Sequence, residues 1–234
     1  MSLNEFANPI ELHAELNPRL WHNGKLRPEV KRTLIKIAQD FYRYIGIKFS
    51  VEDIVVAGSN AAYTYTEHSD LDLHLIANFD SVKCDREAAE LFDTKRLLYK
   101  NDYAVKIRGI PVELYVEDSR YPAVSASYSL ITDHWIRKPE KDIPPHDLAA
   151  VEELADIWRS LIKQAMKTGN LEACRISLGL LRRYRKLGLK NPAGEYSVEN
   201  LVYKSLRNDS TIKGIVTLIN RLHDQELSIV QQQQ

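Results

Sequence analysis

Apolar residues recur every three or four positions in two long parts of this chain, and between these parts they alternate with polar residues. From Pro28 to Gly46 the helical spacing is continuous, with proline at the start and glycine at the end, which predicts an amphipathic helix. A second helix is predicted to begin at Asp85, a potential N-terminal cap. Its spacing places on one face Ala88, Leu91, Phe92, Lys95 and Leu98.

Several shorter runs near these helices have the pattern of strands. Ile54–Ala57 is continuously apolar, and in Leu71–Leu75 apolar residues alternate with polar ones. Tyr103–Ile107 and Ile110–Glu117 flank an Arg-Gly pair and predict a hairpin, whereas Val124–Thr132 offers one further strand. This order of helices and strands predicts an α/β (α+β) fold in which a mixed sheet is flanked by helices.

A domain boundary is predicted at Lys138–Pro145, because three prolines and four charges in eight residues can neither continue a strand nor begin a core. Beyond it the pattern is helical throughout. Predicted helix caps are Asp147, Ser197 and either Asp209 or Ser210, and predicted helix ends are Gly169, Gly188 and about Leu227. The predicted domains are an N-terminal arm at 1–26, a sheet domain at 27–138 and a helical domain at 146–230.

The N-terminal arm contains two Asn-Pro pairs, which favour irregular structure with at most one short helix. Its Trp21-His22-Asn23-Gly24 segment is interpreted as an exposed turn.

Composition narrows the class of protein. The 234 residues are 44% hydrophobic and 27% charged, which is typical of a globular protein and excludes disordered and fibrous classes. The net charge is zero, so any polyanion binding needs a local basic patch. Cys84 and Cys174 follow no metal-binding spacing, and we interpret both as structural thiols in a reducing compartment. Because the chain has no apolar stretch that could span a bilayer, we expect a cytoplasmic protein without a membrane partner.

The candidate chemistry lies between the two central strands. Gly58-Ser59 follows the first strand, where glycine lets the backbone approach a ligand and a hydroxyl can hold phosphate oxygens. In the second strand, alternation places Asp70, Asp72 and His74 on one face. Paired carboxylates on a rigid strand suit a hard cation such as magnesium. The alternative is that these charges are simply the solvated face of a half-buried strand.

Gly58-Ser59, ten intervening residues and then Asp70-Leu71-Asp72 resemble the signature of the nucleotidyltransferase superfamily, to which DNA polymerase beta belongs. The resemblance covers roughly the middle third of the chain. It implies transfer of a nucleoside monophosphate from a nucleoside triphosphate, such as ATP, to an acceptor hydroxyl, with release of pyrophosphate. It also implies that Asp70 and Asp72 bind Mg²⁺ (or Mn²⁺), while Gly58 and Ser59 contact the outgoing phosphates.

Members of this superfamily have a third carboxylate on a neighbouring strand. Glu113 is the candidate, because it alternates with Val112, Leu114 and Val116 and would bind metal with the aspartates. Glu117 shares its predicted face and is the alternative. The acceptor is not indicated: an RNA end, a second nucleotide, a small molecule and a protein all stay open.

A second resemblance is to uncharacterised phage-encoded proteins with this core. It is carried by Leu16–Trp21, by Tyr128–Leu130 together with Trp135-Ile136, and by Gly194–Asn200. It leaves open a non-catalytic function, as a nucleotide-binding or phage assembly protein, and would make the location the host cytoplasm.

One dense basic cluster remains, in the second predicted C-terminal helix. It comprises Arg175, Arg182, Arg183, Arg185, Lys186 and Lys190. A solvated helix face is one explanation, and contact with nucleic acid or a triphosphate is the other.

Overall fold

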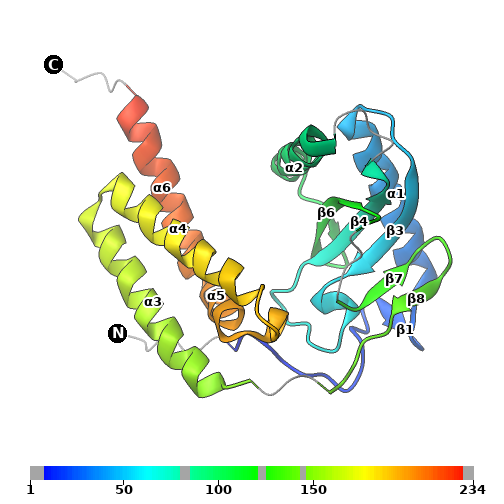
Figure 1. The fold of residues 1–234 in the computed structure, drawn as a ribbon, viewed down its shortest axis with the longest axis horizontal. Helices are drawn as coiled ribbons and strands as arrows, with labels where there is room; N and C mark the ends of the chain where they lie inside the picture. The colour runs from blue at the N-terminus through cyan, green and yellow to red at the C-terminus, as the bar shows by residue number, and fades with distance from the viewer. Residues whose placement is uncertain (1–7, 80–84, 121–124, 143–145, 229–234) are drawn as a thin grey trace. The chain divides into compact units, whose positions relative to one another are not determined.

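The computed structural model describes residues 8–79, 85–120, 125–142 and 146–228, with the side chains of 85–87 left aside (Figure 1). The chain forms two compact units. The sheet unit spans Glu11–Lys141, and the helical unit combines Met1–Ile10 with Asp142–Gln234. The division therefore falls inside the proline-rich segment 138–145, and the N-terminal 26 residues contribute to both units.

The sheet unit is built on a six-stranded mixed sheet with the order β5-β6-β4-β3-β7-β8 (Figure 1). Its strands are β3 (Val51–Ala57), β4 (Leu71–Ala77), β5 (Lys106–Ile107), β6 (Ile110–Asp118), β7 (Ser127–Ser129) and β8 (His134–Arg137). Only β4 and β6 are parallel, whereas the other neighbours are antiparallel. The predicted mixed α/β class is confirmed, and β8 is a strand that the sequence pattern did not indicate.

One face of this sheet packs against helix α1 (Pro28–Ile45), which ends at the left-handed Gly46 as predicted. The inward residues of α1 are Val30, Leu34, Ala38, Phe41 and Ile45, and they join the odd-numbered leucines of β4 in one core. The opposite face of β4 and β6 carries the polar residues.

Helix α2 (Asp85–Asp102) adds the residues Ala88, Phe92 and Tyr99 to the same core. The face predicted for this helix was partly wrong: Leu91 is 37% exposed and Leu98 is 45% exposed. The buried positions follow the aromatic rings instead, because Phe92 packs against Phe49 and Phe79. The predicted cap Asp85 and the thiol Cys84 lie outside the described side chains.

The hairpin predicted around Arg108-Gly109 is confirmed, and both turn residues have positive φ. A second, short hairpin pairs β1 (Trp21–His22) with β2 (Lys25–Leu26). The expectation of an exposed turn here was wrong for Trp21, which is 3% exposed and stacks on Trp135.

The helical unit contains α3 (Leu148–Thr168), α4 (Leu171–Gly188), α5 (Val198–Asn208) and α6 (Thr211–Leu227), together with the short turn Gly194–Tyr196. The predicted caps Asp147 and Ser197 accept hydrogen bonds from the backbone of their own helices. Ahead of α6, the carboxylate of Asp209 accepts from Thr211 N (2.8 Å). These bonds satisfy amide groups that helix starts leave unpaired.

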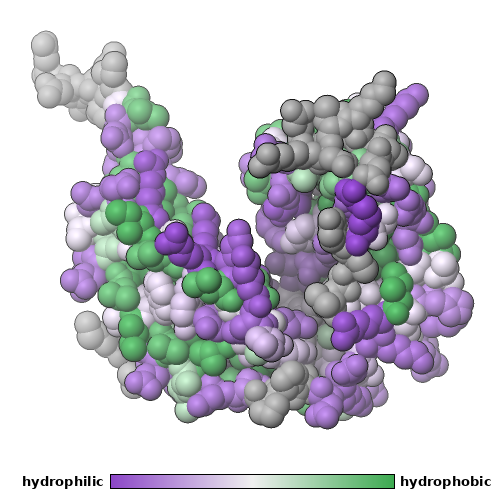
Figure 2. Space-filling view, in the orientation of Figure 1, coloured by the Kyte–Doolittle hydropathy of each residue, from purple (hydrophilic) through white to green (hydrophobic). Residues whose placement is uncertain are grey.

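The core of the helical unit includes Cys174, whose fully buried thiol has a raised pKa because of that burial. Figure 2 shows hydrophobic residues among hydrophilic ones on the surface of the helical unit. None of the helices in the described ranges is long and apolar enough to span a bilayer.

Candidate functional site

The Gly58-Ser59 turn lies directly against the carboxylate of Asp72. Gly58 follows β3 with φ +76°, a conformation that L side chains rarely adopt, and a Cβ atom there would clash with Asp72 Oδ2. The antiparallel pairing of Ala57 with Asp72 produces this approach. Glycine is therefore favoured at this position for two reasons, the positive backbone angle and the lack of space for a side chain beside the Asp72 carboxylate.

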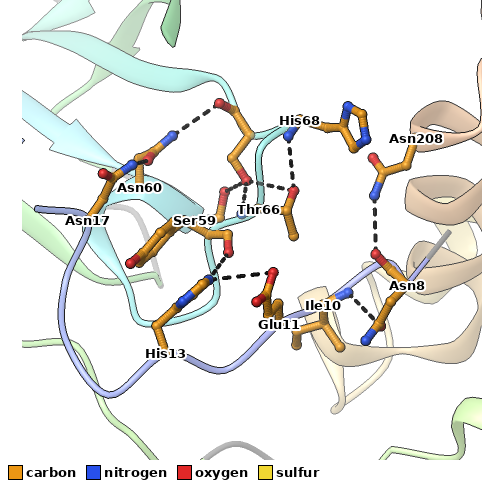
Figure 3. A network of polar contacts seen from close by, with 12 residues as sticks. Asn8, Ile10, Glu11, His13, Asn17, Ser59, Asn60, Thr66, His68 and Asn208 are labelled. Carbon is orange, nitrogen blue, oxygen red and sulfur yellow. Dashed lines mark hydrogen bonds and ion pairs between the residues drawn. The ribbon is translucent and has the colours of Figure 1, made fainter. Parts of the chain in front are cut away.

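The buried side chain of Asn60 holds the two ends of the motif together. Asn60 is 1% exposed, and its Nδ2 donates to the backbone oxygens of Ser69 (3.1 Å) and Asp70 (2.9 Å). Figure 3 shows Asn60 close to Asn17. Its Oδ1 accepts from Asn17 Nδ2 (2.8 Å), and its backbone oxygen accepts from the indole of Trp21 (2.7 Å). Asn60 is a positioning residue that the sequence analysis missed, although it directly follows the Gly-Ser pair.

The hydroxyl groups of this loop form a second network. Ser59 Oγ donates to Ser69 Oγ (2.9 Å), which also accepts from the backbone N–H of Thr66 (2.9 Å) (Figure 3). From the N-terminal segment, His13 stacks on Tyr65 with ring centroids 3.8 Å apart. The loop of ten residues between Ser59 and Asp70 is thus stabilised by hydrogen bonds among its own residues and Ser59, and by a ring contact from the N-terminal segment.

Strand register places two of the predicted acids side by side. Asp72 on β4 pairs with Glu113 on the parallel strand β6, and register partners in neighbouring strands project from the same face. Asp70 precedes β4 by one residue, and its position is set through the backbone contact to Asn60. Asp70 and Asp72 are both half-buried and not fully exposed.

The carboxylate of Glu113 contacts a cation of its own chain. Lys100 on α2 donates to one oxygen, and Tyr115 Oη donates to the other (2.8 Å). Burial acts to raise the pKa of Glu113, but the hydrogen bonds from Lys100 and Tyr115 and the charges of Lys100 and Arg96 outweigh it, so the pKa lies below its usual value. Glu113 is therefore ionised at neutral pH.

The register also decides between Glu113 and Glu117 as the neighbour of Asp72. The next pair on the same face of the two strands is His74 with Tyr115, whose ring centroids are 4.8 Å apart. Glu117 lies beyond that pair, with its Oε1 3.0 Å from His74 Nδ1. Glu113 is the acid beside Asp72, and His74 is largely buried (8% exposed) rather than part of an open polar face.

Tyr115 connects these groups. Its ring stacks on that of His74, and the guanidinium carbon of Arg96 lies 5.0 Å from the centroid of the Tyr115 ring. Burial raises the pKa of Tyr115, and the negative charges of Asp72 and Glu113 raise it further. The phenol therefore stays protonated and donates its hydrogen bond at any physiological pH.

The carboxylates of Asp70, Asp72 and Glu113 are chemically suited to bind a hard cation, because carboxylate oxygens are the ligands that Mg²⁺ prefers. The side chains do not form a complete metal-binding site in this structure. In the described part of the chain, no group of three or more acidic, histidine or cysteine side chains could hold a metal ion. Metal binding by Asp70, Asp72 and Glu113 thus stays a prediction, as does phosphate contact by Gly58 and Ser59.

Comparison with known proteins gives one distant structural match. No family model and no curated protein matches the chain. A solved c-di-GMP synthase, the STING-associated CdnE of Capnocytophaga granulosa, is 11% identical, with 86% of this chain and 84% of that chain covered and a TM-score of 0.21. A similarity this weak carries no argument about the site.

Removing the Asn60 amide should destabilise the sheet unit. We expect Asn60→Ala to lower the free energy of unfolding by about 2–4 kcal/mol, because the Ser69 and Asp70 oxygens and the Asn17 amide lose a buried partner. Chemical denaturation measures this change. Asn101→Ala, at an exposed position of α2, is the control and should be nearly neutral. Equal midpoints for the two variants would contradict the role given to Asn60.

Glycine-to-alanine substitution should have opposite signs at two positions. Gly58→Ala should lower the free energy of unfolding by about 1–3 kcal/mol, because of the positive φ and the clash with Asp72. Gly179→Ala should be neutral or stabilise by up to about 1 kcal/mol, since that helical position has open space around it. The comparison uses denaturant midpoints, and a tolerated Gly58→Ala would show that Asp72 does not lie against the turn.

The Lys100–Glu113 pair should make stability depend on pH. Because the folded-state pKa of Glu113 is lowered, the pair's contribution is fully present above the unfolded pKa, about 4.3, and is lost as pH falls through the folded value. The stability difference between wild type and Lys100→Met should therefore shrink on acidification, and NMR titration should find a higher Glu113 pKa in the variant. Lys95→Met, on the same helix, should leave that pKa unchanged. A difference independent of pH would refute the assignment.

Proposed function

We propose that this protein is a metal-dependent nucleotidyltransferase, which moves a nucleoside monophosphate from a triphosphate to an acceptor hydroxyl and releases pyrophosphate. The observation that carries the proposal is the position of Asp72, whose carboxylate lies against the Gly58-Ser59 turn and has Glu113 as its register neighbour. A phosphate-sized anion held at the turn would thus lie beside paired carboxylates. The sequence resemblance points to the same residues.

In this proposal Asp70 and Asp72 hold Mg²⁺ or Mn²⁺, with Glu113 as the third ligand. The cation supplies charge neutralisation for the phosphoryl group, which is the main need of this reaction. Gly58 allows close approach of the outgoing phosphates, and the Ser59 hydroxyl orients them. Asn60 is a positioning residue, because it fixes the backbone of Asp70 against the turn.

The contacts of Glu113 also bear on a second candidate function, a non-catalytic nucleotide-binding protein. The Glu113 carboxylate binds Lys100 and Tyr115, which favours a non-catalytic use of the scaffold if that contact persists when nucleotide binds. The two functions differ in one property: only the enzyme requires that Glu113 exchange Lys100 for a metal ion.

Loss of the paired carboxylates should abolish transfer. We expect Asp70→Asn with Asp72→Asn to reduce the rate at least about a hundredfold, because the cation contributes several kcal/mol of charge stabilisation. The assay incubates the protein with each labelled ribonucleoside triphosphate and a cell extract, and follows which molecules gain mass. The matched control, Glu52→Gln with Glu67→Gln, removes the same charge from exposed positions.

Thermal shift provides the second readout of the same variants. Triphosphate should stabilise the wild type only when Mg²⁺ or Mn²⁺ is present, and should not stabilise the aspartate variant. Stabilisation without metal, equal in both proteins and without transfer, would contradict the enzyme and favour the nucleotide-binding scaffold.

A further inference from the structure

Positive charge is concentrated in one segment of the helical unit. Residues 173–194 contain the six cations of the basic cluster and no Asp or Glu. The chain as a whole has 32 Lys and Arg against 32 Asp and Glu, so the remainder is net negative. Charges on a merely solvated helix face are usually of both signs, and this segregation points to an anionic partner.

Part of the cluster surrounds an open hollow between α4 and α5, which pack against each other (Figure 1). The basic hollow has a volume of about 420 Å³ and is lined by Arg182, Arg185, Lys186, Leu189 and Tyr203. Three of these five residues are cations and none is an acid. The volume is within the usual range of small-ligand sites.

The guanidinium of Arg185 is fixed by two contacts. Its Nε donates to Asn200 Oδ1 (3.0 Å), and its central carbon lies 4.5 Å from the ring centroid of Tyr203. Asn200 is itself buried and donates from Nδ2 to the backbone oxygen of Glu195 (2.7 Å). An arginine whose plane is held in this way loses little side-chain entropy when it binds an anion.

Arg182 and Lys186 lie one helical turn apart on α4, and both are exposed. Within the described ranges no acidic side chain forms an ion pair with either of them, whereas Arg159 in the same unit pairs with Asp209 at 2.8 Å. The negative end of the helix dipole accounts for cations in the last turn. It does not account for Arg182, or for the buried amide and the ring that fix Arg185.

We propose that the basic hollow binds phosphate groups of a nucleotide or of a single-stranded oligonucleotide. Arginine presents a planar fork that matches phosphate oxygens, and lysine adds a flexible point charge. Arg185 provides the oriented donor, and Arg182 and Lys186 neutralise adjoining phosphates. All lining residues of the basic hollow belong to the helical unit, and the proposed binding does not depend on nucleotidyl transfer.

The test measures binding by fluorescence anisotropy in EDTA, with two labelled probes: ATP and an RNA strand of about ten nucleotides. Arg182→Gln with Lys186→Gln should weaken binding of the recognised probe about tenfold or more. For RNA, it should also reduce the slope of log K against log salt by about 1.4, the value for two phosphate contacts on a single strand. Tighter binding of RNA than of ATP identifies an oligonucleotide ligand, and the reverse identifies a nucleotide.

The matched control is Lys163→Gln with Lys167→Gln, which removes two charges from exposed positions of α3. It should change affinity less than about twofold. A second variant, Arg185→Lys, keeps the charge but removes the fork, and should also weaken binding. Equal loss in the α3 control, an unchanged affinity for Arg185→Lys, or no binding of either probe by the wild type would overturn the proposal. Binding should survive in Asp70→Asn with Asp72→Asn, so failure here is separable from failure of the proposed enzyme.

Discussion

The sheet unit depends on one buried amide, the side chain of Asn60. Out of water, its two polar atoms must find partners in the protein, and those partners are the backbone of Ser69 and Asp70 and the side chain of Asn17. The same contacts tie the end of β3 to the start of β4. The spacing between Gly58-Ser59 and the aspartates is therefore set by hydrogen bonding, and a longer or shorter loop would leave buried polar groups unpaired.

Short-range patterns predicted what depends on neighbours in sequence. Helical spacing with proline and glycine gave the bounds of α1, and alternation separated the leucines of β4 from Asp72. The same logic could not find the N-terminal contacts. Trp21 is buried because it stacks on Trp135 and donates to Asn60, and both partners are distant in sequence. No local pattern indicates which residue will lie opposite.

The choice between Glu113 and Glu117 as the acid beside Asp72 is a second feature that local sequence patterns could not decide. Glu113 and Glu117 have equal claims by alternation, since both project from one face of β6. The parallel register with β4 separates them, because it places Glu113 beside Asp72 and leaves His74 and Tyr115 between Asp72 and Glu117. Register is a property of two strands together, and residue spacing within one strand does not contain it.

Lys100 stabilises the ionised form of Glu113, the acid beside Asp72. Asp72 and Glu113 are like charges on adjacent strands, and such a pair raises the cost of ionising both. Burial also acts to raise the pKa of Glu113, but the hydrogen bonds from Lys100 and Tyr115 and the charges of Lys100 and Arg96 keep that pKa below its usual value. On the proposed function, a divalent cation held by Asp70, Asp72 and Glu113 would supply positive charge to the Glu113 carboxylate, as Lys100 does in this structure. Because its pKa is lowered, Glu113 would bind such a cation without first releasing a proton.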